Sequence, residues 1–352
     1  MGVPTTRDRA LWNGHLSMLV NGKWTADWHP LQAHDAHGRF LRQVSQFRSW
    51  ISPRGQSAPT GDEGFTAEPR RYHLYVALTC PWASRALMAR KLKGLDAVIS
   101  VSVVEPAMTD QGWRFGDHPG ANRDAINGAT YLHEIYTKAD ATYTGRATVP
   151  VLWDTDRQTI VNNESADIVR MMNSGFGTLA EDSVNLYPDD LNSEIDALNE
   201  EIYIRLNNGV YRAGFASTQA AYEEAFWDVF GMLDTLETRL KDQTFLFGDR
   251  LTETDIRLFV TLVRFDVAYH GLFKCNLRRI SDYPAVATYL HRLLAFDKIA
   301  ETVNIDHIKR GYYSIKALNP SGIVPIGPDL QWFTPRRRST VLRNGAGPGL
   351  VS

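Results

Sequence analysis

The sequence predicts a protein in which an α/β domain is followed by an all-helical domain. Two observations predict this fold class. Between residues 71 and 180, short runs of β-branched and aromatic residues alternate with helix-like segments, and from about residue 189 apolar residues recur at helical spacing. The chain has 352 residues, enough for about two domains at ~150 residues each.

The first 70 residues are rich in Trp, Pro, Gly and Ser and show no sustained period of 2 or 3.6. We therefore expect residues 1–70 to form an N-terminal coil that extends over the body of the protein. Four tryptophans would hold this coil in place: Trp12, Trp24, Trp28 and Trp50.

The α/β domain is expected over residues 71–180. The segments predicted as strands are RYHLYVAL (71–78), AVISVSVVEP (97–106), VPVLWD (149–154) and QTIVNN (158–163). The segments predicted as helices are PWASRALMARKLKG (81–94), which ends at Gly94, and ESADIVRMMNSG (164–175). A long polar, Gly-rich insert occupies residues 107–147. The first strand–helix–strand unit predicts a parallel pair joined by a right-handed crossover.

The helical domain is expected over residues 189–328. Apolar residues fall at helical spacing in three runs: Leu191, Ile195, Leu198, Ile202 and Leu206; Phe226, Phe230, Leu233, Leu236 and Leu240; and Ile256, Phe259, Val260, Val263 and Val267. Before the third run, Thr252 and Asp255 have the spacing of a capping box, which predicts a helix start. Residues 329–352 are expected to form a flexible tail.

The composition is that of an ordinary globular protein, with 43% hydrophobic and 22% charged residues. The formal net charge of -2 argues against a nucleic-acid partner, which requires a basic surface. No apolar stretch approaches the ~20 residues that span a bilayer, so no membrane association is expected. Two cysteines, Cys80 and Cys275, build neither a disulfide framework nor a zinc site, so we expect no metal and a cytoplasmic location.

Cys80 stands between the first predicted strand and the first predicted helix, directly before Pro81. A helix N-terminus lowers the pKa of a thiol, because its unpaired N–H groups and positive dipole end favour the thiolate, which is the nucleophilic form. Proline suits the first helical position and leaves the N–H groups of Trp82 and Ala83 to face the sulfur. The alternative is a buried structural cysteine, which is the interpretation we keep for Cys275.

The residue three positions after Cys80 is Ala83, where a CxxC motif would have a second cysteine. A CxxC site resolves a mixed disulfide internally by thiol–disulfide exchange. A lone cysteine must wait for an external thiol, and glutathione is the abundant one in the cytosol. The motif therefore indicates glutathione-dependent monothiol chemistry.

Several segments resemble the cysteine-type glutathione transferases: CPWA (80–83), VPVLWD (149–154), NNES (162–165) and FLFGDRLTETDI (245–256). Others resemble one class of these, the glutathionyl-hydroquinone reductases or Xi class: CPWASR (80–85), GWRF (112–115), FKCNLRRI (273–280) and DHIKRGYYSIKALNPSGIVPIGP (306–328). The resemblance covers most of residues 40–328. It implies a thioredoxin-like N-terminal α/β domain plus an all-α C-terminal domain, the glutathione transferase fold, with the active site in the cleft between them.

The resemblance also implies roles for individual residues. Cys80 would be the nucleophile. The glutathione site would consist of Trp113, Val149, Pro150, Glu164 and Ser165, with Pro150 in cis. Val149 would pair with the cysteinyl part of glutathione, Glu164 and Ser165 would hold the γ-glutamyl end, and Trp113 would stack on the peptide. Without the family context, Ser165 is equally well interpreted as a plain helix cap.

Three tyrosines are the best matches for residues that contact the hydroquinone hydroxyls: Tyr211, Tyr312 and Tyr313. The alternative is that they are amphipathic packing residues. The implied reaction is glutathione-dependent reduction of glutathionyl-hydroquinones through a Cys80–glutathione mixed disulfide. Two alternatives stay open, an omega-like thiol transferase or dehydroascorbate reductase and a non-catalytic scaffold. The resemblance further implies a homodimer.

Overall fold

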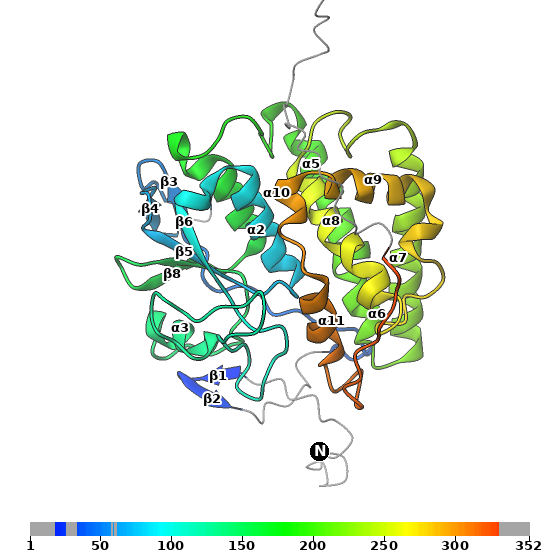
Figure 1. Cartoon of the computed structure of the whole chain (residues 1–352), viewed down its shortest axis with the longest axis horizontal. Coiled ribbons are helices and arrows are strands. Elements are labelled where there is room, and N and C mark those ends of the chain that lie inside the picture. The colour runs from blue at the N-terminus through cyan, green and yellow to red at the C-terminus, as the bar shows by residue number, and fades with distance from the viewer. Residues whose placement is uncertain (1–17, 26–33, 58, 60–61, 331–352) are drawn as a thin grey trace, which may run out of the picture.

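The fold places a four-stranded sheet beside a larger group of helices, with α2 and α11 at the junction between them (Figure 1). The structure is a computed structural model, and it describes residues 18–25, 34–57, 59 and 62–330. Trp12, Trp28 and the predicted tail beyond residue 330 lie outside the described residues. None of the described helices combines the length and the apolar content that crossing a membrane requires.

The main sheet has the strand order β6-β5-β7-β8. Its strands are β5 (Tyr72–Val76), β6 (Ile99–Val103), β7 (Val151–Asp154) and β8 (Thr159–Asn162). β5 pairs in parallel with β6, as predicted, and antiparallel with β7, which forms a hairpin with β8. All five residues of the central strand β5 are buried. A strand covered on both faces gains most from a continuous apolar run, which is how this segment was predicted.

Helices α2 (Pro81–Leu92) and α4 (Ser165–Arg170) pack against each other, and α2 also packs against helices of the C-terminal half. α2 ends just before Gly94, whose φ of 64° is the left-handed conformation that terminates helices. Because α2 lies between the sheet and the second group of helices, nearly all of its side chains are buried.

The C-terminal half is helical, as predicted. Its helices are α5 (Asn192–Ile202), α6 (Gly209–Gly214), α7 (Gln219–Arg239), α8 (Glu253–Arg264), α9 (Pro284–Leu294), α10 (Asp297–Ala300) and α11 (Ile305–Tyr313). π-helical turns extend α4, α5 and α8: Met171–Gly175, Tyr203–Asn207 and Phe265–Tyr269. Short 3-10 turns occupy Leu95–Ala97, Gly177–Leu179, Asp189–Leu191, Leu240–Asp242 and Ile280–Asp282. The capping box of Thr252 and Asp255 begins α8, as predicted.

The described part of the N-terminal coil contains short strands that the sequence pattern did not indicate: β1 (Met18–Val20) with β2 (Lys23–Thr25), and β3 (Trp50–Ser52) with β4 (Gly64–Thr66). Each has three residues, too few for an alternation to be recognised in the sequence. The Trp24 ring stacks on the His133 ring with 4.5 Å between centroids, so this segment does pack on the body.

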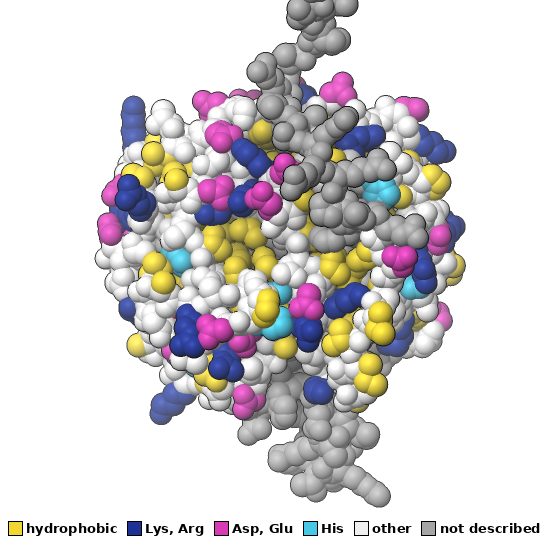
Figure 2. Space-filling view, viewed as in Figure 1, with side chains coloured by type: hydrophobic (Ala, Val, Ile, Leu, Met, Phe, Trp, Pro, Cys, Tyr) yellow, Lys and Arg dark blue, Asp and Glu magenta, His cyan; other side chains and the backbone are white. Residues whose placement is uncertain are grey.

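The insert at residues 107–147 also contains an unpredicted helix, α3 (Leu132–Ala139). Its start is stabilised by Glu134, whose carboxylate accepts from the N–H groups of Thr130 and Tyr131. The polar composition of the insert concealed this helix, because only a few of its residues are buried. On the face shown in Figure 2, Lys and Arg side chains are interspersed with Asp and Glu.

Candidate active site

Cys80 is the N-cap residue of α2 and is half-buried. Its Sγ lies 3.6 Å from the carbonyl oxygen of Val149. The Val149–Pro150 peptide bond is cis, as the resemblance implied. The sheet explains the proximity: β5 runs into the Cys80 loop, and its residue Tyr75 is paired with Val151 at the start of β7.

Burial raises the pKa of the Cys80 thiol. Four groups oppose this effect, namely the N–H groups of Ala83 and Trp82 and the guanidinium groups of Arg264 and Arg42. These N–H groups favour the thiolate, as predicted, although none of them makes a full hydrogen bond to the Cys80 side chain, and the expectation of a lowered pKa is wrong in sign. That expectation counted the helix dipole and left out the cost of taking a thiolate out of water.

Arg264 connects the helical half to the Cys80 loop through hydrogen bonds. Only 2% of this residue is exposed, and it donates to the carbonyl oxygens of Leu78 (2.9 Å) and Thr79 (3.0 Å) and to Ser84 Oγ (2.7 Å). It also donates to Val260 within its own helix, α8. No local pattern indicated this role, because Arg264 is distant along the chain from the loop that it contacts.

Three tyrosine hydroxyls from the helical half meet in one cluster. The Tyr312 hydroxyl lies 2.6 Å from that of Tyr211 and 2.7 Å from that of Tyr269. Burial raises the pKa of all three phenols. A thiolate at Cys80 raises the pKa of Tyr211 further, and the Tyr211 ring contacts the ring of Trp82, the second residue after Cys80.

The cluster differs from the predicted tyrosine set in one member. Tyr313 does not join it, because its hydroxyl lies against Gly271, and Tyr269 takes its place. Tyr269 ends the π-helical turn that follows α8, two residues beyond the last apolar position of the predicted run. Continuing the predicted apolar run from Val267 to the aromatic residue Tyr269 would have identified this tyrosine from the sequence.

Aromatic rings line the space between Cys80 and the tyrosine cluster. Tyr211 contacts Phe273 with 5.3 Å between centroids and Trp82 with 6.4 Å. The Arg42 guanidinium lies 4.5 Å from the Trp82 ring centroid and 5.0 Å from that of Tyr211. Aromatic rings and phenol hydroxyls are thus grouped beside Cys80, a combination of groups that can contact an aromatic ring carrying hydroxyls.

Glu164 and Ser165 lie at the same edge of the sheet as Val149, because the β7–β8 hairpin pairs Leu152 with Asn162. Glu164 is the N-cap of α4, and its carboxylate accepts from the Ala166 N–H at 3.1 Å. Ser165 is the first residue of α4 and is buried, so the interpretation of Ser165 as the helix cap is wrong.

Trp113 lies in the insert and is half-buried. Its carbonyl oxygen accepts from the N–H of Leu132 at 2.9 Å. Across the described part of the chain, no hydrogen bond or ring contact joins Trp113 to Cys80, and its place in the glutathione site stays a prediction.

Arg146 is a residue of this site that the sequence did not single out. It precedes Val149 in the same loop, and burial and the neighbouring Arg42 together lower the pKa of its guanidinium to about 10. Within the described residues its guanidinium has no hydrogen-bonding partner. A half-buried cation without a counter-ion favours binding of an anion.

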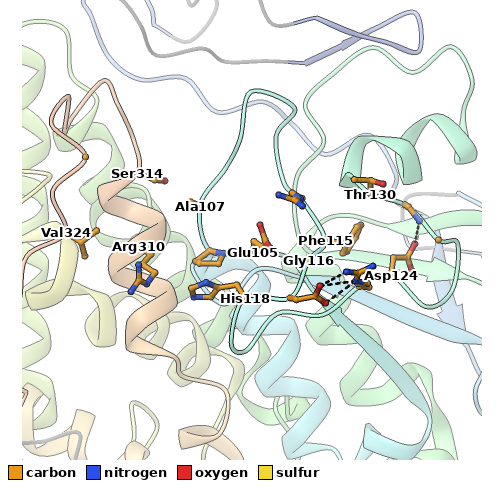
Figure 3. Close-up of a pocket in the computed structure, with 17 residues that line it drawn as sticks. Glu105, Ala107, Phe115, Gly116, His118, Asp124, Thr130, Arg310, Ser314 and Val324 are labelled. Atoms are coloured by element: carbon orange, nitrogen blue, oxygen red, sulfur yellow. Dashed lines mark hydrogen bonds and ion pairs between the residues drawn. The ribbon is translucent and has the colours of Figure 1, made fainter.

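A separate cavity of about 810 Å³ lies on another side of α11. Figure 3 shows Arg310 of α11 and Ser314, which follows α11, on one side and Phe115 and Asp124 on the other. Most of its charged groups are already paired within the protein, as in the Arg123–Asp117 and Arg310–Asp306 ion pairs. Cys80 does not line this cavity, so the thiol does not act there.

Two family models match the chain. The model described as "Glutathione S-transferase, N-terminal domain" matches residues 79–174, and the one described as "Glutathione S-transferase, C-terminal domain" matches residues 219–292. The first begins one residue before Cys80, and the second covers α7 through most of α9.

The chain is similar to curated and solved proteins along most of its length. It is 48% identical over 314 residues to the glutathionyl-hydroquinone reductase PcpF of Sphingobium chlorophenolicum, covering 89% of this chain and 96% of that protein. A glutathione-bound structure of YqjG, a glutathione transferase homologue from Escherichia coli K-12, is 47% identical with a TM-score of 0.82, covering 90% and 97%. A Xi-class glutathione transferase from Natrialba magadii is 44% identical with a TM-score of 0.83, covering 92% and 96%.

Proposed function

Since the chain belongs to the Xi-class glutathione transferases, the family of the glutathionyl-hydroquinone reductases, we propose that it reduces glutathionyl-hydroquinones to hydroquinones at the expense of glutathione. The observation that carries this proposal is the lone cysteine Cys80 beside three linked tyrosine hydroxyls and the aromatic rings that contact them. The site thus offers a sulfur nucleophile and hydroxyl groups for a phenolic ring in one space.

Glutathione, as co-substrate, would lie along the loop before β7. The backbone of Val149 offers a carbonyl oxygen beside Cys80 Sγ, which suits the cysteinyl part of the peptide. Glu164 and the first amides of α4 would receive the γ-glutamyl end, because a carboxylate pairs with an ammonium and helix amides pair with a carboxylate. Arg146 would pair with the remaining carboxylate of the glycyl end.

The first step forms a disulfide and breaks a carbon–sulfur bond. The Cys80 thiolate attacks the glutathionyl sulfur, and the ring leaves with the electron pair of the carbon–sulfur bond and takes up one proton. Cys80 is thereby oxidised to a mixed disulfide with glutathione, and the ring carbon is reduced to C–H. A second glutathione thiolate then attacks the mixed disulfide, which releases glutathione disulfide and restores the Cys80 thiol.

The tyrosine cluster supplies what the ring requires. Hydroxyl groups within hydrogen-bonding distance can hold the hydroquinone oxygens and pass a proton among themselves toward the leaving carbon. Tyr211 is the member near Cys80, and Tyr312 connects it to the buried Tyr269. Their raised pKa values keep all three phenols protonated at neutral pH, so they act as donors.

The remaining cysteine does not replace glutathione in the second step. Cys275 is fully buried, and burial raises the pKa of its thiol to about 12. A thiol in that state is a poor nucleophile. External glutathione is therefore the resolving thiol, which agrees with the absence of a second cysteine from the CPWA segment.

The experiment that tests the proposal is a turnover assay with a glutathionyl-hydroquinone and glutathione, read by chromatography for free hydroquinone. In a single turnover, the intact mass should increase by one glutathione at Cys80. Cys80→Ser should abolish release, and Cys275→Ser is the matched control that should retain it. Reduction of simple mixed disulfides without hydroquinone release would indicate an omega-like thiol transferase instead. Absence of both activities in the wild type would favour a non-catalytic scaffold, and full hydroquinone release by Cys80→Ser would remove the assignment of Cys80 as the nucleophile.

We also propose that the protein acts in the cytoplasm as a homodimer. The cytoplasm is where reduced glutathione is abundant, and the homodimer is an implication of the family resemblance. Light scattering of the purified chain would test the second point, since a mass near twice 39.7 kDa is expected.

A further inference from the structure

Residues 34–49 connect the helical half of the molecule with the sheet. This segment is called the strap. Its first part binds the helical half: the His34 ring contacts the carbonyl oxygen of Phe215 at 2.7 Å, and Arg39 forms a 2.8 Å ion pair with Glu224. The carbonyl oxygen of His37 also accepts from Thr218 Oγ1 at 2.9 Å.

The second part of the strap binds the sheet side at the predicted glutathione site. Ser45 Oγ donates to the Glu164 carboxylate at 3.0 Å, and the Phe47 N–H donates to Asn163 Oδ1 at 3.2 Å. Arg48 Nη2 donates to Asp167 at 2.9 Å. The strap is thus fixed at both ends, and Arg42 stands between the two sets of contacts.

Arg42 places its guanidinium between the two halves of the molecule. The group lies over the rings of Trp82 and Tyr211, one from each half of the molecule. Its Nε donates to Asn208 Oδ1 at 3.2 Å, while its terminal nitrogens have no hydrogen-bonding partner within the described residues. Arg42 is exposed, so a ligand can reach these donors.

The other cation beside the thiol, Arg264, already makes hydrogen bonds within the protein. Arg264 is buried and donates to three backbone carbonyl oxygens and one hydroxyl. Arg264 contacts the carbonyl oxygen of Thr79, the residue before Cys80, and Arg42 contacts the ring of Trp82, the second residue after it. Arg264 thus uses four of its five N–H donors inside the protein, whereas Arg42 is exposed and its terminal nitrogens are open to a substrate.

We propose that Arg42 is a specificity-determining residue that selects glutathionyl-hydroquinones whose ring carries an anionic substituent, such as a carboxylate. This inference rests on the proposed function. A ring placed between Cys80 and Tyr211 has the Arg42 guanidinium beside it. A planar guanidinium pairs with a carboxylate through two parallel hydrogen bonds, which a neutral substituent cannot accept with the same strength.

The test compares two substrates, a carboxyl-substituted and a methyl-substituted glutathionyl-hydroquinone with the substituent at the same ring position. The measured quantity is the ratio of their kcat/KM values. In Arg42→Gln this ratio should decrease about tenfold or more, the size expected for a hydrogen-bonded charge pair. Arg42→Lys should give an intermediate ratio, because the charge remains and the planar fork is lost.

Arg39→Gln is the matched control, since it removes a guanidinium from the same strap outside the cleft and should leave the ratio unchanged. An unchanged ratio in Arg42→Gln, with the wild type active on both substrates, would overturn the role of Arg42 and leave the proposed function standing. A ratio that decreases equally in Arg39→Gln would overturn it too, because strap position and not the Arg42 charge would then select the substrate. If the wild type releases hydroquinone from neither substrate, the proposed function itself is overturned.

Discussion

Replacing Tyr312 by Phe removes one oxygen atom from the centre of the tyrosine cluster. That oxygen makes two hydrogen bonds, of 2.6 Å with Tyr211 and 2.7 Å with Tyr269. Tyr269 is 0% exposed, so water cannot replace the lost partner. A buried polar group that loses its partner costs about 1–3 kcal/mol, and we expect the free energy of unfolding to decrease by that amount.

Catalysis should be affected more strongly than stability. If the cluster positions the ring and delivers the proton, Tyr312→Phe removes a contribution that is typically on the order of 10²-fold or more in rate. Hydroquinone release should therefore slow by about that factor. Reduction of a small aliphatic mixed disulfide through Cys80 should slow far less, because no ring has to be protonated.

Tyr313→Phe is the matched control, because it removes the same atom from the next residue of α11. The Tyr313 hydroxyl lies against Gly271 and, within the described chain, makes no hydrogen bond. We expect its unfolding free energy to change by less than ~0.5 kcal/mol, with hydroquinone release retained. Urea titration and the chromatographic assay measure the two quantities. Equal losses of hydroquinone release in both variants, or equal losses of both activities in Tyr312→Phe, would refute the reasoning.

Three further predictions concern the cations and the thiols. Arg146→Gln should raise the KM for glutathione about tenfold with little change in kcat, in steady-state kinetics, because one charged hydrogen-bonded contact is lost. Arg264→Gln should reduce the free energy of unfolding by at least about 1.5 kcal/mol in a urea titration, because carbonyl oxygens of the Cys80 loop lose a charged donor. Alkylation should label Cys80 before Cys275, with a rate that increases as the pH rises past 9.0, because burial raises the Cys80 pKa above that ordinary value and only the thiolate reacts. Cys275 should stay unlabelled until the pH approaches the raised pKa of about 12. Peptide mass mapping separates the two thiols, and earlier labelling of Cys275 would contradict the assignment.

Local pattern in the sequence was sufficient for most of the secondary structure. The four strands of the main sheet and the helices that carry long apolar runs were predicted because burial imposes a period on the chain. The segments that were missed have no such period. β1 to β4 are three residues long each, and α3 is amphipathic over only eight residues within a polar insert.

The sequence by itself determined the fold class, the position of Cys80 at a helix start and the need for an external thiol. All three follow from neighbours along the chain, where strand, Cys, Pro and helix succeed one another and Ala83 replaces a second cysteine. The amides that face the sulfur are set by the same local geometry.

Only the tertiary structure decided the electrostatics of the Cys80 thiol and which tyrosines form the hydroxyl cluster. The pKa of Cys80 depends on how much water the packed site excludes, and its nearby cations, Arg42 and Arg264, come from the strap and from α8. Tyr269 joins Tyr312 because the end of α8 packs against α11, while Tyr313, next along the same helix, points elsewhere. Such contacts join residues that are far apart in the chain, and no local period encodes which of them will meet.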